Sequence, residues 1–144
     1  MPQQRTPLEE PLPPHNVQAE EAVLAALMVN PDALAAVTPL LTAGMFFRTA
    51  NGHIYTAILA AAQRYSHVNM ITVAHELARE NKLDEAGGLP FLSRIISNLM
   101  TAGAPEAYAA IIRECAVRRD MIAKAGAVVR DAHSGRVGRG GIGL

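Results

Sequence analysis

Apolar residues recur every three or four positions along most of this chain, a spacing that places them on one face of an α-helix. The first such stretch follows Asn16, whose side-chain oxygen can cap a helix N-terminus. Glu20 and Glu21 then lie where the helix dipole is positive, which favours carboxylates. The apolar stripe of this predicted helix consists of Ala19, Ala22, Val23, Ala26 and Leu27.

Turn residues divide the rest of the chain into further helices. Asn30 and Pro31 start a short second helix, which Pro39 ends, and an apolar loop follows at residues 40–47. We predict a third, central helix over residues 50–66, a fourth capped by Thr72, and a fifth opened by Leu89 and Pro90 after the Gly87–Gly88 break. The apolar residues of the third helix are Ile54, Tyr55, Ile58, Leu59, Ala61, Ala62 and Tyr65.

The last predicted helix is much longer than the others. It starts near Pro105 and meets one internal glycine, Gly126, before Ser134 and Gly135 end it. About 29 residues at 1.5 Å each give a rod of roughly 43 Å, longer than a compact domain of this size is wide. One end of this arm helix should therefore protrude from the body.

Apolar spacing along the arm helix alternates between three and four residues, the heptad pattern of a helix that packs on another helix. Its first half can pack on the body, but no helix remains in this chain to cover its second half. Exposed apolar faces of this kind indicate a protein partner. The predicted seam is Tyr108, Ile111, Cys115, Arg118, Ile122, Ala125, Val129 and Ala132, and the candidate protein-interaction residues are Arg118, Ile122, Ala125, Val129 and Ala132.

The predicted fold is all-α, because no stretch alternates with the two-residue period of a strand. It consists of a compact body of about five short helices and a long protruding C-terminal helix, half of a helical hairpin. We expect a flexible Pro-rich tail at residues 1–14, a helical domain at 15–133 with its arm helix at about 105–133, and a flexible Gly/Arg-rich end at 134–144.

Charge and composition limit the possible partners and the cellular location of the protein. The formal net charge is zero, yet residues 1–112 carry an excess of acidic groups and the rest an excess of basic ones. The basic part could face nucleic acid, an acidic partner or only solvent. The single cysteine, Cys115, excludes an internal disulfide and is expected to be a small buried apolar group. Without a signal-peptide core or a membrane-length apolar run, the expected location is the cytoplasm.

The sequence offers no catalytic constellation. Gly138, Gly140 and Gly143 spell GxGxxG, but a helix rather than a strand precedes them, so we interpret them as a flexible end. No Gly-Lys-Ser/Thr phosphate loop occurs, and the histidines share no metal-ligand spacing; His75–Glu76 begins an HExxH motif that Arg79 interrupts. We therefore expect no cofactor, no metal and no ATP hydrolysis from this chain.

An ordered set of residues is similar to the N-terminal collar domain of DnaB-type replicative DNA helicases. The resemblance covers about residues 13–131, whereas Ala25, Asn69, Met100 and Pro105 depart from the family's usual residues in ways that affect turns more than the fold. The residues that carry it are Pro14, His15, Asn16, Ala19, Glu20, Ala22, Val23, Leu24, Asn30, Pro31, Phe46, His53, Ile54, Tyr55, Ala57, Ile58, Thr72, Val73, Leu77, Gly87, Gly88, Phe91, Leu92, Tyr108, Ala109, Ile112, Glu114, Arg118 and Arg119.

The resemblance implies a module that self-associates into the collar of a hexameric ring and docks primase and, in some systems, a helicase loader. The family continues into a second hairpin helix, a linker helix and a motor domain that binds ATP and Mg²⁺ and moves on single-stranded DNA. We expect this chain to be either a shortened piece of such a helicase or a natural short form of it. In the family, DNA is expected to be contacted only through the motor domain, which this chain lacks. Two alternatives stay open: the helicase-binding domain of a primase, and an unrelated helical adaptor or DNA-binding regulator.

Overall fold

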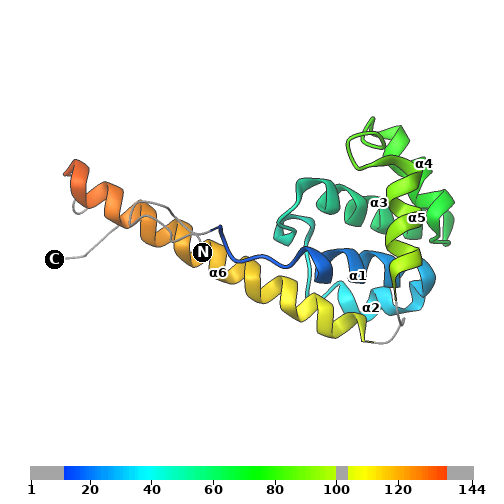
Figure 1. Ribbon diagram of the computed structural model, residues 1–144, viewed down its shortest axis with the longest axis horizontal. Helices are drawn as coiled ribbons and strands as arrows, with labels where there is room; N and C mark the ends of the chain where they lie inside the picture. Colours follow the sequence, from blue (N-terminus) through cyan, green and yellow to red (C-terminus); the bar gives the residue numbers. More distant parts are fainter. Residues whose placement is uncertain (1–11, 100–103, 136–144) are drawn as a thin grey trace, which may run out of the picture.

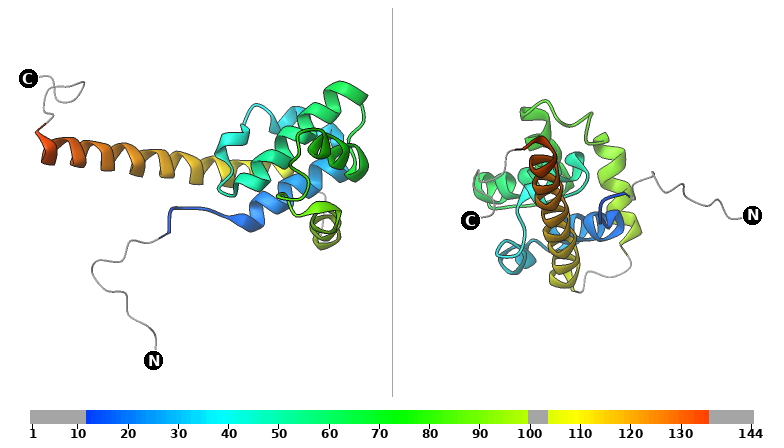
Figure 2. Two further views of the ribbon diagram at one scale, coloured as in Figure 1. Left: turned by 90° about the horizontal axis from the view of Figure 1, so that it is seen from above. Right: turned by 90° about the vertical axis from the view of Figure 1, so that its left-hand side faces the viewer.

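The computed structural model describes residues 12–99 and 104–135, and all regular structure within these ranges is helical. The expected all-α fold is thus confirmed. Helices α1–α5 form a body at one end, and α6 starts beneath this body and extends well beyond it (Figures 1 and 2). The helices are α1 (Val17–Val29), η1 (Pro31–Ala33), α2 (Leu34–Val37), η2 (Ala43–Met45), α3 (Thr49–Tyr65), α4 (Met70–Arg79), α5 (Gly88–Asn98) and α6 (Pro105–Ser134), where η1 and η2 are short 3-10 helices.

The central helix of the body is α1, not α3 as the sequence predicted. Six consecutive α1 residues, 23–28, are buried, so the helix is covered on every side instead of along one stripe. It packs against α3, α5 and α6. As predicted, Asn16 caps its N-terminus, with its side-chain oxygen accepting a hydrogen bond from the Ala19 backbone N–H at 2.9 Å.

Helix α3 and the preceding loop form a second layer over α1. Ile54, Tyr55 and Ile58 are buried, and the Tyr55 hydroxyl donates to the Leu41 carbonyl at 3.1 Å. Burial of this phenol raises the pKa of Tyr55. Tyr65, which the sequence placed on the apolar face, is instead 39% exposed and lies edge-on to His75.

The starts of α4 and α5 show how turn chemistry places each helix. Asn69 caps α4 by accepting from the backbone N–H groups of Ile71 and Thr72, while the Thr72 hydroxyl accepts from the Asn69 N–H. Thr72 is therefore the third residue of a capping box and not the cap that the sequence predicted. Before α5, Gly87 and Gly88 have positive φ angles, which glycine adopts without strain.

The predicted limits of the long helix are confirmed to within one residue. It begins at Pro105, which needs no N–H partner at this position, and Gly135 caps its end with a positive φ angle. The Pro-rich segment before residue 12 and the glycines at 138, 140 and 143 lie outside the described residues. None of the described helices is both long and apolar enough to cross a membrane.

Candidate protein-interaction site

The first part of α6 attaches to the body through a face different from the predicted seam. Ile112 is 1% exposed, whereas its neighbour Ile111, which the seam included, is 37% exposed. Ala109 and Pro105 are buried on the same side as Ile112. Cys115 is half-buried, not buried as expected. The body-facing stripe is therefore rotated around the helix axis by about one residue, or ~100°, from Ile111 to Ile112.

Within the described residues, Arg119 makes the hydrogen bonds to the body that lie furthest along α6. Its guanidinium donates to the Pro14 carbonyl at 2.8 Å and to the Met45 carbonyl at 2.6 Å, and it lies 5.7 Å from the centroid of the Phe47 ring. Past this residue α6 extends away from helices α1–α5 (Figure 1). We call residues 120–134 of α6 the free arm.

All five candidate interaction residues are exposed, four of them on the free arm and Arg118 just before it. Ile122 and Val129 are 58% and 55% exposed, and Ala125 and Ala132 lie between them along the helix. The structure thus brings the five residues together on one side of α6, centred roughly 120° around the helix axis from Ile112. Their role in binding stays a prediction.

The free arm exposes more apolar surface than the sequence seam included. Met121 and Val128 are as exposed as Ile122 and Val129. At 100° per residue, Met121 and Val128 lie on one flank of Ala125 and Ala132, and Ile122 and Val129 lie on the other. The apolar strip, formed by Met121, Ile122, Ala125, Val128, Val129 and Ala132, covers an arc of roughly 120°.

Charged residues accompany this strip. Lys124 forms an ion pair with Asp120 one turn earlier, at 2.8 Å. The hydrogen bond that Lys124 donates to the Asp120 carboxylate, together with the negative charge of that carboxylate, raises the pKa of Lys124. Both side chains are largely exposed, so the pair contributes solubility and local helix stability more than affinity.

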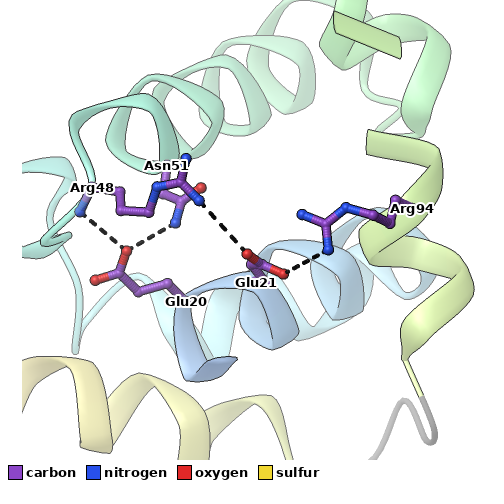
Figure 3. Close-up of polar contacts among 5 residues, drawn as sticks. All are labelled: Glu20, Glu21, Arg48, Asn51 and Arg94. Carbon is purple, nitrogen blue, oxygen red and sulfur yellow. Dashed lines mark hydrogen bonds and ion pairs between the residues drawn. The ribbon is translucent and has the colours of Figure 1, made fainter. Parts of the chain in front are cut away.

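On the body, a group of polar residues joins α1, α3 and α5 (Figure 3). The Glu20 carboxylate is buried and accepts from the Phe47 and Arg48 backbone N–H groups at 2.6 and 3.4 Å, and from the Asn51 side chain at 2.9 Å. Glu20 therefore caps the N-terminus of α3 from another helix. The sequence predicted only that Glu20 stabilises the dipole of α1, and it did not indicate this capping role.

Glu21 occupies a different position in the same group. It lies between two arginines, 3.9 Å from the Arg48 guanidinium and 3.7 Å from that of Arg94 (Figure 3). Arg94 also lies over the Phe91 ring, 5.0 Å from its centroid. With Glu20, this group holds two arginines and two carboxylates, so their formal charges cancel.

A cleft of about 680 Å³ opens beside this group, between α1, α5 and the start of α6. Its apolar residues include Ile95 and Leu99, and its charged residues are Arg94 and Glu21, which form the ion pair described above. An apolar floor with polar groups at the rim is the usual composition of a groove that receives an amphipathic segment.

The remaining polar residues of the described ranges include no candidate metal site. No group of three or more His, Cys, Asp or Glu side chains within residues 12–99 and 104–135 could hold a metal ion. Glu76, in the interrupted HExxH pattern, is buried and pairs with Arg64 at 2.8 Å. Arg79, at the position of the second histidine, lies 3.8 Å from the same carboxylate.

Comparison with known proteins places this arrangement in a family. A family model described as DnaB-like helicase N terminal domain matches residues 12–114. The chain is 35% identical over 127 residues to the replicative DNA helicase DnaC of Bacillus subtilis. It is 36% identical over 125 residues to the replicative DNA helicase DnaB of Geobacillus stearothermophilus. These alignments cover 88% and 87% of the chain but only 28% of either relative.

The solved structures agree with the sequence comparison. The crystal structure of the N-terminal domain of DnaB helicase from Mycobacterium tuberculosis superposes with a TM-score of 0.82 at 35% identity. The match covers 86% of this chain and 89% of that one. These similarities favour a helicase domain over a primase domain or an unrelated adaptor.

Proposed function

Because this chain belongs to the family of DnaB-like helicase N-terminal domains, we propose that it is the oligomerisation and protein-interaction domain of a replicative DNA helicase. The observation that carries this proposal is the exposed apolar strip of the free arm. Met121 and Ile122 are 63% and 58% exposed, and they lie on the free arm, past the part of α6 that packs on the body. A strip of this kind is stable in water mainly when another helix covers it.

The covering element is a second copy of this domain. The strip is about 120° wide, broader than the seam of a two-stranded coiled coil, so it can contact two helices at once. Ala125 and Ala132 along its middle permit close approach, while Met121 with Val128 and Ile122 with Val129 form a seam on either flank. This geometry supports the collar of a ring, in which each arm meets more than one neighbouring helix.

The chain spans 28% of the length of the two relatives described above. The sequence also has no phosphate loop. We therefore assign ATP and Mg²⁺ binding and movement on DNA to other parts of such a helicase. The setting that fits this assignment is the replisome in the cytoplasm of a bacterium or of a phage-infected cell.

Self-association through the apolar strip can be tested with charged substitutions. We expect the wild-type chain to self-associate reversibly in sedimentation velocity, and Ile122→Glu and Val129→Glu to shift it to monomer. A carboxylate buried in the strip without a partner costs several kcal/mol, enough to dissociate a weak complex.

The matched control is Ala123→Glu, which adds the same charge at an exposed position on the opposite side of the free arm. This variant should associate like the wild type. A wild type that stays monomeric at high micromolar concentration, or two strip variants that associate unchanged, would contradict self-association through this strip.

Primase docking, with a helicase loader as a further partner, is the second part of the proposed function. The cleft between α1, α5 and α6 supports it, because it combines apolar residues with a polar rim on which Arg94 and Glu21 form an ion pair. We propose that it receives an amphipathic helix of the primase.

The cleft can be blocked from α5. We expect Asn98→Trp, at the cleft rim, to weaken binding of the primase from the same organism at least about tenfold in isothermal titration, because the indole fills the groove. Ser93→Trp, exposed on α5 outside the cleft, should bind like the wild type. Equal binding by both variants would place the primase elsewhere on the domain.

A further inference from the structure

Three segments of the chain that are distant in sequence meet at a single side chain. Arg119 of α6 reaches the Pro14 carbonyl, 105 residues away along the chain, and the Met45 carbonyl, 74 residues away. One guanidinium thus ties α6 both to the segment before α1 and to the η2 loop. A planar group with several N–H donors is well suited to bridging two acceptors in this way.

Aromatic stacking completes this contact. The Phe47 ring lies under the Arg119 guanidinium and stacks on the His15 ring, with centroids 4.3 Å apart and planes 18° apart. His15 in turn makes a hydrogen bond with the Pro13 carbonyl at 2.7 Å. The segment at residues 13–15 is therefore held against α6 from two directions.

We propose that Arg119 is the positioning residue that fixes the direction in which the free arm leaves the body. The apolar attachment of α6 is concentrated at Ala109 and Ile112, near one end of a 30-residue helix. A rod held only there could pivot. Next to Ile112, the Arg113 guanidinium donates to the Leu40 carbonyl at 3.2 Å. Arg119 supplies a separate attachment, about 10 Å from Ile112 along the axis.

The length of the free arm amplifies any movement at Arg119. The end of the helix lies about 33 Å from Ile112, roughly three times as far as Arg119 does. A displacement of about 1 Å at Arg119 therefore moves the end of the arm by about 3 Å. That shift is close to the optimal distance between two carbon atoms in contact, which is about 3.5–4 Å. It therefore decides whether the apolar strips of two copies interdigitate.

This role is separate from self-association, because the direction of the arm is a property of a single chain. It also separates Arg119 from its neighbour Arg118, which is exposed. A general stabilising role for positive charge in this region would affect both residues alike, whereas a bridge between two carbonyls depends on Arg119 alone.

The test measures the distance between body and arm by pulsed electron paramagnetic resonance. Spin labels are placed at Gln63 on α3 and Ser134 at the end of α6, both exposed, after Cys115→Ser removes the native thiol. Labelled chain is diluted in excess unlabelled chain, so that distances between copies do not contribute. We expect a narrow distribution for the wild type and one at least about twofold broader for Arg119→Met.

Arg118→Met should keep the narrow distribution, and Arg119→Lys should be intermediate, because one ammonium cannot bridge both carbonyls in the geometry of a guanidinium. Helix content is checked by circular dichroism. A distribution for Arg119→Met as narrow as that of the wild type would overturn the proposal. If Arg119→Met does not fold, a narrow distribution for Arg119→Lys would overturn it as well.

Discussion

Replacing Ile58 by alanine is expected to lower the free energy of unfolding by about 2–5 kcal/mol, as is the same change at Ile95. Both side chains are buried in the one hydrophobic core that joins α1, α3 and α5. Each substitution removes three carbon atoms from a tightly packed interior and leaves a cavity that the neighbouring helices can fill only in part. Chemical denaturation followed by circular dichroism measures this loss.

A matched isoleucine on the surface supplies the control. Ile71, in the first turn of α4, is 64% exposed, whereas Ile58 is 0% exposed. Ile71→Ala should change the free energy of unfolding by less than about 0.5 kcal/mol. Similar small changes at Ile58 and Ile95 would mean that these two residues do not face a shared core.

Most of the fold could be predicted because local chemistry fixes where helices start and stop. Pro105 and Gly135 delimit α6, and Asn16 caps α1, since each residue suits a position that few others can occupy. The cap of α4 was assigned to the wrong residue because Asn69 and Thr72 both belong to the capping box, and both residue types cap helices. Sequence alone does not rank two good caps three positions apart.

Periodicity was less reliable where apolar residues are adjacent. Helix α6 contains three pairs of adjacent apolar residues, Ile111–Ile112, Met121–Ile122 and Val128–Val129, and either member of a pair fits an apolar helix face with regular spacing. Only packing against the body shows that Ile112, and not Ile111, faces inward. The heptad spacing selected Ile111 and omitted Met121 and Val128. The same difficulty hid the central position of α1, where a run of small and apolar residues is buried on all sides.

Polar contacts between distant segments could not be predicted from spacing. Arg119 and Glu20 act on backbone groups that only the tertiary fold brings near, and nothing in their neighbouring residues indicates those acceptors and donors. One signal was present: Glu20 lies next to the apolar run of α1, on a helix with little polar surface. A charged residue in such a place is a candidate for a buried partner.

Glu20→Ala is expected to cost about 3–5 kcal/mol of unfolding free energy, an effect similar to the core substitutions but with a different cause. The change leaves the Phe47 and Arg48 backbone N–H groups and the Asn51 amide without their acceptor in a buried site. Each buried donor left without a partner costs about 1–3 kcal/mol. Glu20→Gln should cost less, because one side-chain oxygen still accepts from these groups.

The adjacent Glu21 provides the comparison that identifies burial as the cause. Its ion pairs with Arg48 and Arg94 are long, at 3.9 and 3.7 Å, and its side chain is 20% exposed with half-exposed partners. We therefore expect Glu21→Ala to cost less than about 1 kcal/mol in the same denaturation experiment. Two neighbouring glutamates of equal charge should thus differ several-fold in their effect. Equal losses would show that Glu20 stabilises through its charge on the α1 dipole, and not by capping α3.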